Sequence, residues 1–88
     1  MLWGAGSNGK DLAKLLKEKQ DSFHWVCDNQ KKIGKHIYDV ALEDYKVIPK
    51  ITRPQIIIAV TSPKEKSKIK KQLTLWEKEA MLDYWFFI

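Results

Sequence analysis

Apolar and polar positions at the start of the chain predict a strand, a helix and a second strand. Residues 1–3 are apolar and are followed at once by the glycine-rich residues 4–9. Leucines then recur at spacings of three and four with lysines between them, at Leu12, Leu15 and Leu16. This spacing predicts an amphipathic helix of about three turns that ends near residues 20–22. Residues 23–27 are rich in aromatic and β-branched side chains and predict a short buried strand.

The middle of the chain has a weaker pattern. Residues 29–36 are polar and contain Gly34, which predicts a turn. We expect residues 36–41 to form a short strand at the edge of a sheet. Residues 42–45 are expected to form one helical turn before an irregular stretch around Pro49 and Pro54.

The second half predicts a strand, a helix and a last strand. Residues 56–60 are continuously apolar and mostly β-branched, as in a strand buried on both faces of a parallel sheet. Ser62, Pro63 and Glu65 then form a capping-box pattern with proline at the first helical position. One face of the predicted helix carries Ile69, Leu73, Trp76 and Ala80. The aromatic residues 83–88 are expected to end the chain as a strand.

Strands that alternate with helices predict an α/β fold with right-handed crossovers. The expected parallel sheet has about four strands in the order second, first, third, fourth, with helices on both faces. A length of 88 residues allows one domain, residues 1–88, complete or as part of a longer protein. One short helix cannot cover one whole face of this sheet. We therefore expect part of the face near Ile56, Ile58, Trp85 and Phe87, whichever alternate set points outward, to stay uncovered and to support self-association or docking on another domain.

Composition restricts the setting and the partners. The longest apolar run is far shorter than the roughly 20 residues that cross a bilayer, and no secretory leader is recognisable. A single cysteine, Cys27, excludes a disulfide framework within the chain, which favours the cytoplasm. The net charge is +5, but Arg53 is the one arginine among 16 basic residues. Base edges and phosphates are recognised best by arginine, so this composition argues against nucleic acid as a partner.

The glycines after the first strand predict a nucleotide-binding turn. Gly4-x-Gly6-x-x-Gly9 lies between a predicted strand and a predicted helix. Gly4 permits the sharp turn, Gly6 leaves room for a phosphate, and Gly9 lets the helix pack closely on the strand. Asp28 follows the second strand, where a carboxylate binds ribose hydroxyls and repels a 2′-phosphate, so NAD is favoured over NADP. The alternative is that these glycines only shape a tight turn.

The same segment also contains Gly4-x-x-x-x-Gly9-Lys10, which is close to a P-loop. Asp11 stands where a P-loop has the serine or threonine that binds magnesium. A carboxylate at this position would face the phosphates of the nucleotide. We therefore favour the dinucleotide type of turn.

Three segments together resemble a Rossmann-like domain of bacterial surface-polysaccharide enzymes: residues 3–10, residues 25–29 and residues 33–35. Similar segments precede sugar acyltransferase domains and occur in nucleotide-sugar dehydratases. The resemblance implies a Rossmann-like sheet and a bound NAD or nucleotide-sugar. It implies ligand contacts for the turn residues Gly4, Ala5, Gly6, Ser7, Asn8 and Gly9, and for Asp28 and Asn29.

The chain departs from this family in ways that bear on catalysis. The first strand is short, and Asp39 replaces a glycine that usually lies just before the family's next valine. The 88 residues do not include the catalytic domain that normally follows. No catalytic residues are evident, because Asp28 raises the pKa of the neighbouring Cys27 thiol and makes it a poor nucleophile. Whether the protein is an enzyme stays open. The alternative to nucleotide binding is a non-catalytic interaction module with an architectural glycine turn.

Overall fold

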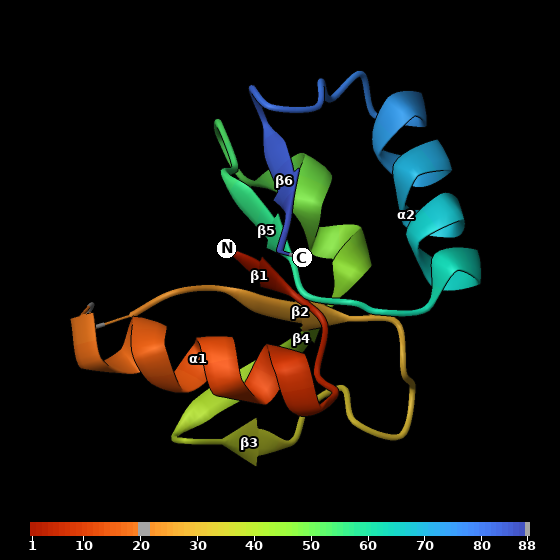
Figure 1. The fold of residues 1–88 in the computed structure, drawn as a ribbon. Helices are drawn as coiled ribbons and strands as arrows, with labels where there is room; N and C mark the ends of the chain where they lie inside the picture. The colour runs from red at the N-terminus through yellow and green to blue at the C-terminus, as the bar shows by residue number, and fades with distance from the viewer. Residues whose placement is uncertain (20–21, 88) are drawn as a thin grey trace.

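One sheet runs through the molecule, and helices pack on both of its faces (Figure 1). The computed structural model describes residues 1–19 and 22–87. The strands are β1 (Leu2–Trp3), β2 (Trp25–Cys27), β3 (His36–Ile37), β4 (Val40–Asp44), β5 (Ile56–Ile58) and β6 (Tyr84–Phe86). The helices are α1 (Ser7–Lys19), the 3-10 helix η1 (Tyr45–Lys50) and α2 (Pro63–Leu75). None of the described helices is both long and apolar enough to span a bilayer.

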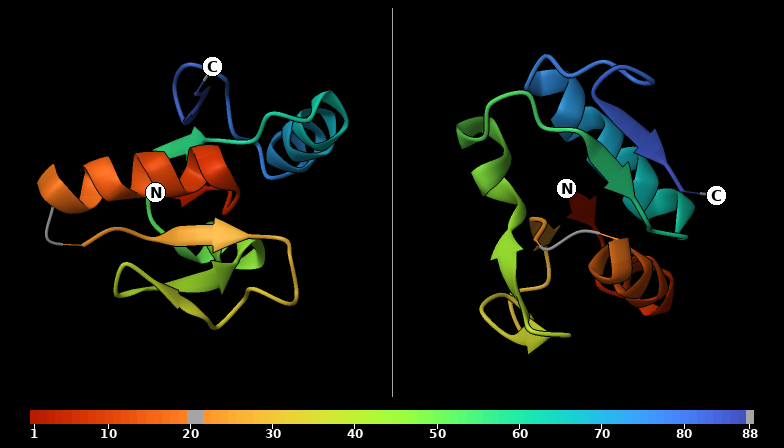
Figure 2. Two further views of the ribbon diagram at one scale, coloured as in Figure 1. Left: turned by 60° about the horizontal axis from the view of Figure 1, so that its bottom comes forward. Right: turned by 90° about the vertical axis from the view of Figure 1, so that its left-hand side faces the viewer.

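Within the described residues, the sheet has six strands in the order β3-β4-β2-β1-β5-β6. Neighbours from β4 to β6 are parallel, and Leu2 lies opposite both Trp25 and Ile57. β3 is the antiparallel edge strand, and in Figure 2 it lies beside β4, which separates it from β2. The predicted order second, first, third, fourth holds among β2, β1, β5 and β6, but the predicted count of about four strands is wrong. β4 and β3 extend the sheet beyond β2, so the full strand order differs from the prediction.

The prediction of a helical turn over residues 42–45 is also wrong. These residues belong mostly to β4, in which Leu42 pairs with Trp25 and is 1% exposed. Burial against the neighbouring strand outweighs the local sequence preference, which carries little information over so few residues. η1 begins at Tyr45, directly after β4. The carboxylate of Asp44, the last residue of β4, accepts a hydrogen bond of 3.0 Å from the Lys46 N–H and caps η1.

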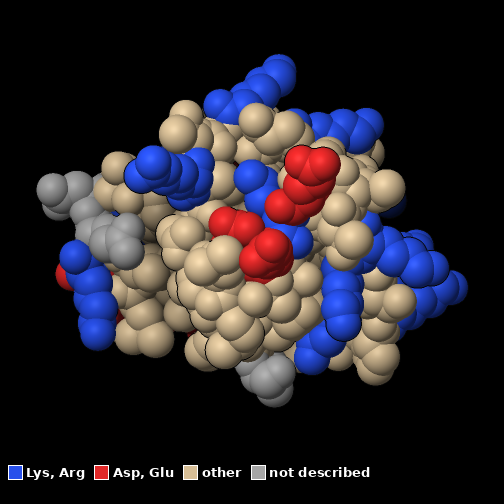
Figure 3. All heavy atoms as spheres, turned by 90° about the horizontal axis from the view of Figure 1, so that it is seen from above, with Lys and Arg blue, Asp and Glu red and all other residues tan. Residues whose placement is uncertain are grey.

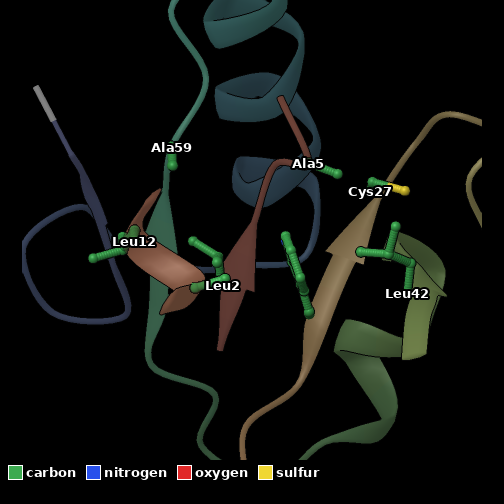
Figure 4. Packing of buried hydrophobic residues seen from close by; sticks show 8 residues of the cluster. Leu2, Ala5, Leu12, Cys27, Leu42 and Ala59 are labelled. Atoms are coloured by element: carbon green, nitrogen blue, oxygen red, sulfur yellow. The ribbon is translucent and has the colours of Figure 1, made fainter. Parts of the chain in front are cut away.

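The core has two layers, one on each face of the sheet. α1 contributes Leu12 and Ala13 to the first layer, in which Figure 4 shows Leu2, Ala5 and Cys27 among the labelled side chains. In the second layer, residues of η1 and α2 pack against strand residues on the other face. Its members are Trp3, Val26, Ile48, Ile56, Ile58, Ile69, Leu73 and Tyr84. The sequence-based expectation of helices on both faces is confirmed.

α2 begins as its sequence indicates and ends earlier than expected. The Ser62 hydroxyl accepts a hydrogen bond from the Glu65 N–H, and Pro63 is the first helical residue. The chain leaves the helix through Glu77, whose φ is +59°, so the predicted helix face is wrong at Ala80. The predicted end of the first helix falls on residues 20 and 21, and the predicted last strand includes residue 88. These positions lie outside the described residues.

Candidate functional site

The candidate site lies at the carboxyl ends of the central parallel strands. The segments that leave β1, β2 and β5 lie together at the lower right of Figure 1. β1 has β2 on one side and β5 on the other, so the chain reverses its direction across the sheet at β1. In open α/β sheets this switch point forms the crevice in which ligands bind.

Two of the three predicted glycines are required by the fold itself. Gly4 has a φ of +127°, and a Cβ on it would lie 2.7 Å from the Ala59 carbonyl oxygen. A Cβ on Gly9 would overlap the carbonyl oxygen of Gly4. The buried Trp25 indole N–H donates a hydrogen bond of 2.7 Å to that same Gly4 oxygen. Gly9 therefore allows α1 to pack closely on the end of β1, as predicted. Gly4 allows the turn after β1 to lie against the backbone of Ala59, and neither Cβ position is open to a ligand.

Gly6 is different, because it faces open space. It is exposed, and beyond its two chain neighbours no residue lies within 4 Å of the position that its Cβ would occupy. α1 begins at the next residue, Ser7. The first N–H groups of a helix have no partner within the helix, and the helix dipole places partial positive charge there. An anion that approaches Gly6 would therefore meet amide donors, and no side chain on residue 6 would obstruct it.

Two adjoining hollows lie between this turn, the segment after β2 and α2. The smaller has a volume of about 200 Å³, and Ala5, Gly6, Asp28 and Asn29 are among the residues that line it. The larger has about 350 Å³ and includes Tyr45, which stacks on Trp3 with the ring centroids 5.3 Å apart. Both hollows share Trp3, Asp28 and Ile69. They form one cleft, with Asp28 at the junction.

Asp28 and Asn29 have different roles in this cleft. Asp28 is exposed and lines both hollows, where a ribose could be bound. The Asn29 side-chain oxygen accepts a hydrogen bond from the Lys31 N–H, and its carbonyl oxygen accepts from the Lys32 and Ile33 N–H groups. Asn29 thus shapes the turn as well as lining the smaller hollow. Ser7 and Asn8, also expected as ligand contacts, lie in the first turn of α1 and line neither hollow.

Lysines in the cleft are absent from the sequence-based prediction. The Lys32 ammonium donates a hydrogen bond of 2.9 Å to the Ala5 carbonyl oxygen and lines the smaller hollow. Lys46 and Lys68 line the larger one. Lys32 is 27 residues away from Ala5 in the chain. No local spacing signals this contact, since it depends on how the segment after β2 folds back over the glycine turn.

Cys27 and His24 give no sign of a catalytic group. Cys27 is buried, and burial raises the pKa of its thiol, with a further increase from the Asp28 charge. The predicted direction is confirmed, although burial rather than Asp28 is the main cause. His24 is 54% exposed and forms an ion pair of 2.8 Å with Glu43. In the part of the chain that the structure describes, no group of three or more His, Cys, Asp or Glu side chains could hold a metal ion.

The parallel strands, the glycine turn at β1 and the helices on both faces define a Rossmann-like fold. No protein-family model and no curated protein matches the sequence. The crystal structure of RSP, a Rex-family repressor, is similar with a TM-score of 0.69, and RSP in complex with β-NADH with 0.67. Both are 18% identical to the chain over 99% of its length.

The likeness to RSP establishes the fold alone. The chain spans less than half of the similar chains, 43% and 44% of their length. Both similar structures are of a repressor, and one contains NADH. Neither connects the chain with surface-polysaccharide enzymes, so that part of the expected resemblance has no support from the comparisons.

Proposed function

We propose that the chain binds an NAD-type dinucleotide in the cleft at the carboxyl ends of β1 and β2. The observation that carries this proposal is the open space at Gly6, which adjoins the hollow that Asp28 also lines. The similar structure with bound β-NADH supports the same ligand class. A nucleotide-sugar shares the diphosphate and is the competing ligand, without support from the comparisons.

Each part of such a ligand has a suitable partner in the cleft. The diphosphate lies against the amide groups at Gly6 and the start of α1, where the helix dipole favours an anion. The Asp28 carboxylate accepts hydrogen bonds from the ribose hydroxyls and repels a 2′-phosphate, so NAD binds better than NADP. The buried, protonated thiol of Cys27 is no nucleophile, and the proposed role is binding rather than catalysis.

Titration calorimetry with NADH, a UDP-sugar and S-adenosylmethionine tests the proposal. NADH is expected to bind with micromolar affinity, more tightly than NADPH. The chain binds no nucleotide if all three ligands give no heat at high micromolar protein and no change in tryptophan fluorescence. Tighter binding of the UDP-sugar than of NADH would assign the cleft to the competing ligand.

Two variants test which residues make the contacts. Gly6→Val places its Cβ in the open space that the diphosphate would occupy, so it should abolish NADH binding and leave the fold intact. Asp28→Asn should weaken NADH binding by about tenfold through loss of a charged hydrogen bond. Asp39→Asn is the matched control, because Asp39 is an exposed turn residue with a φ of +63°, which asparagine tolerates. Equal effects of Asp28→Asn and Asp39→Asn would exclude a specific ribose contact.

An apolar hollow supports a second candidate function, a non-catalytic interaction module. The hollow has a volume of about 380 Å³ and lies on the face of the sheet that carries α1. Its lining residues are Met1, Leu16, Phe23, Gln55, Ile57, Trp85, Phe86 and Phe87. Of the four residues expected near an uncovered face, Trp85 and Phe87 line this hollow. Ile56 and Ile58 are buried on the opposite face of the sheet. Gly6→Val separates the two functions, because it should leave any association intact.

A further inference from the structure

Lys32 connects the segment after β2 with the glycine turn. Its ammonium group lies 2.9 Å from the Ala5 carbonyl oxygen, one residue before Gly6. The side chain is half-buried and lines the same small hollow as Gly6 and Asp28. A positive charge therefore lies beside the open space where a ligand would approach the backbone.

We propose that Lys32 is the counterion for a diphosphate at the glycine turn and thereby restricts the ligand to organic diphosphates. This inference rests on the proposed function and adds the chemical class that the cleft selects. NAD and nucleotide-sugars belong to that class. S-adenosylmethionine has no phosphate, so it offers no diphosphate for the Lys32 ammonium group to bind.

The geometry leaves Lys32 able to act in this way. An ammonium group has three donors, and the Ala5 carbonyl oxygen accepts one of them, which leaves two for phosphate oxygens. Among the residues that the structure describes, the ion pair within 4 Å is that between His24 and Glu43. No described carboxylate therefore neutralises Lys32 at that distance. Charged hydrogen bonds are stronger than neutral ones, more so where water is partly excluded.

Lys32 also has a structural role in the free protein. The contact with Ala5 connects two loops whose only covalent link is the intervening α1 and β2. A purely structural lysine would affect all ligands of the cleft equally, because it would change the shape of the site. A counterion instead affects only ligands that carry phosphate. The number of phosphates on the ligand therefore distinguishes the two roles.

The test compares Lys32→Gln with Lys35→Gln, a matched change at an exposed lysine of the same segment. NADH and ADP are titrated directly, and adenosine is measured by displacement of NADH. Lys32→Gln should weaken NADH and ADP by about tenfold, which corresponds to about 1.4 kcal/mol, and leave adenosine within a factor of two. Lys32→Arg should restore most of the lost affinity. Lys35→Gln should leave all three affinities unchanged.

Each other outcome has a defined meaning. Equal NADH affinity of the wild type and Lys32→Gln overturns the inference and leaves the proposed function standing. An equal loss of adenosine and ADP affinity assigns Lys32 a structural role and also overturns it. A wild type that binds neither NADH nor ADP overturns the proposed function itself. If Lys32→Gln does not fold, the salt dependence of binding to the wild type tests the inference instead. Added salt must weaken the affinity for NADH and leave the affinity for adenosine unchanged.

Discussion

The three glycines of the turn look equivalent in the sequence and differ in the structure. Gly4 and Gly9 are buried against backbone atoms, whereas Gly6 is exposed to the cleft. A substitution at Gly9 therefore acts on the fold, and one at Gly6 acts on the ligand. The motif in the sequence does not distinguish the three glycines. The atoms around each one show whether the missing side chain makes room for the protein backbone or leaves space for a ligand.

The first prediction concerns stability at these positions. Gly9→Ala should lower the free energy of unfolding by about 1–3 kcal/mol, because the new Cβ overlaps the Gly4 carbonyl oxygen and the backbone must shift. Gly6→Ala should change it by less than about 0.5 kcal/mol, because its Cβ enters open space. Urea unfolding measures both. Similar losses at the two positions would contradict this assignment of their roles.

The second prediction concerns pH. Burial raises the pKa of the Cys27 thiol, so the folded chain keeps a proton that the unfolded chain loses above about pH 8.5. The folded state then binds more protons, and the free energy of unfolding falls as pH rises above that value, by up to about 1.4 kcal/mol per pH unit. Cys27→Ala should remove this contribution to the slope. Unfolding at pH 7.5, 8.5 and 9.5 compares the two proteins, and equal slopes would contradict the prediction.

At the scale of the elements, strong local signals are confirmed, and the weak helical signal over residues 42–45 fails. The isoleucine-rich run gives β5, and the Ser62–Glu65 pattern gives the start of α2. β4 fails as a sequence-based prediction, because Leu42 becomes a strand residue through pairing with Trp25 of β2. Lys32 is missed for the same reason, since its contact with Ala5 forms only when the segment after β2 folds back. Contacts between residues far apart in the chain produce no regular spacing in the sequence from which they could be predicted.

The third prediction tests the cap of α2. The Ser62 hydroxyl accepts from the Glu65 N–H at 3.4 Å, a long hydrogen bond. Ser62→Ala should therefore lower the free energy of unfolding by about 0.5–1 kcal/mol, near the low end for helix caps. Ser67→Ala is the control within the same helix, because Ser67 is exposed and alanine favours helix. Thermal unfolding should show a lower Tm for the first variant and no decrease for the second.

The whole molecule combines a polar cleft at the carboxyl ends of the strands with an apolar hollow on the α1 face. Seen from above, Asp and Glu side chains gather near the middle of the surface and Lys and Arg side chains surround them (Figure 3). This face presents mixed charge in place of one basic area, although the net charge is +5. The argument against nucleic acid as a partner stays a prediction from composition.

The last prediction concerns self-association through the apolar hollow. A second copy that covers it would bury Trp85 and Phe87, and exposed apolar surface of this kind usually marks an interface. The side chain of Phe87 is 42% exposed just after β6, so Phe87→Lys should dissociate the assembly with little effect on the fold. Leu75→Lys is the control, because Leu75 is 76% exposed at the end of α2.

Sedimentation velocity between about 1 and 100 μM measures the effect of each variant. Wild type and Leu75→Lys should show a sedimentation coefficient that rises with concentration, and Phe87→Lys should sediment as a monomer throughout. Burial of an aromatic side chain contributes about 1.5–3 kcal/mol, and it contributes twice in a two-fold interface, so its loss shifts a micromolar dimer beyond this range. A wild type that is monomeric at 100 μM would exclude a second copy of the chain as the partner of this hollow. NADH binding by Phe87→Lys would then still be expected, because the cleft and the hollow share no residue.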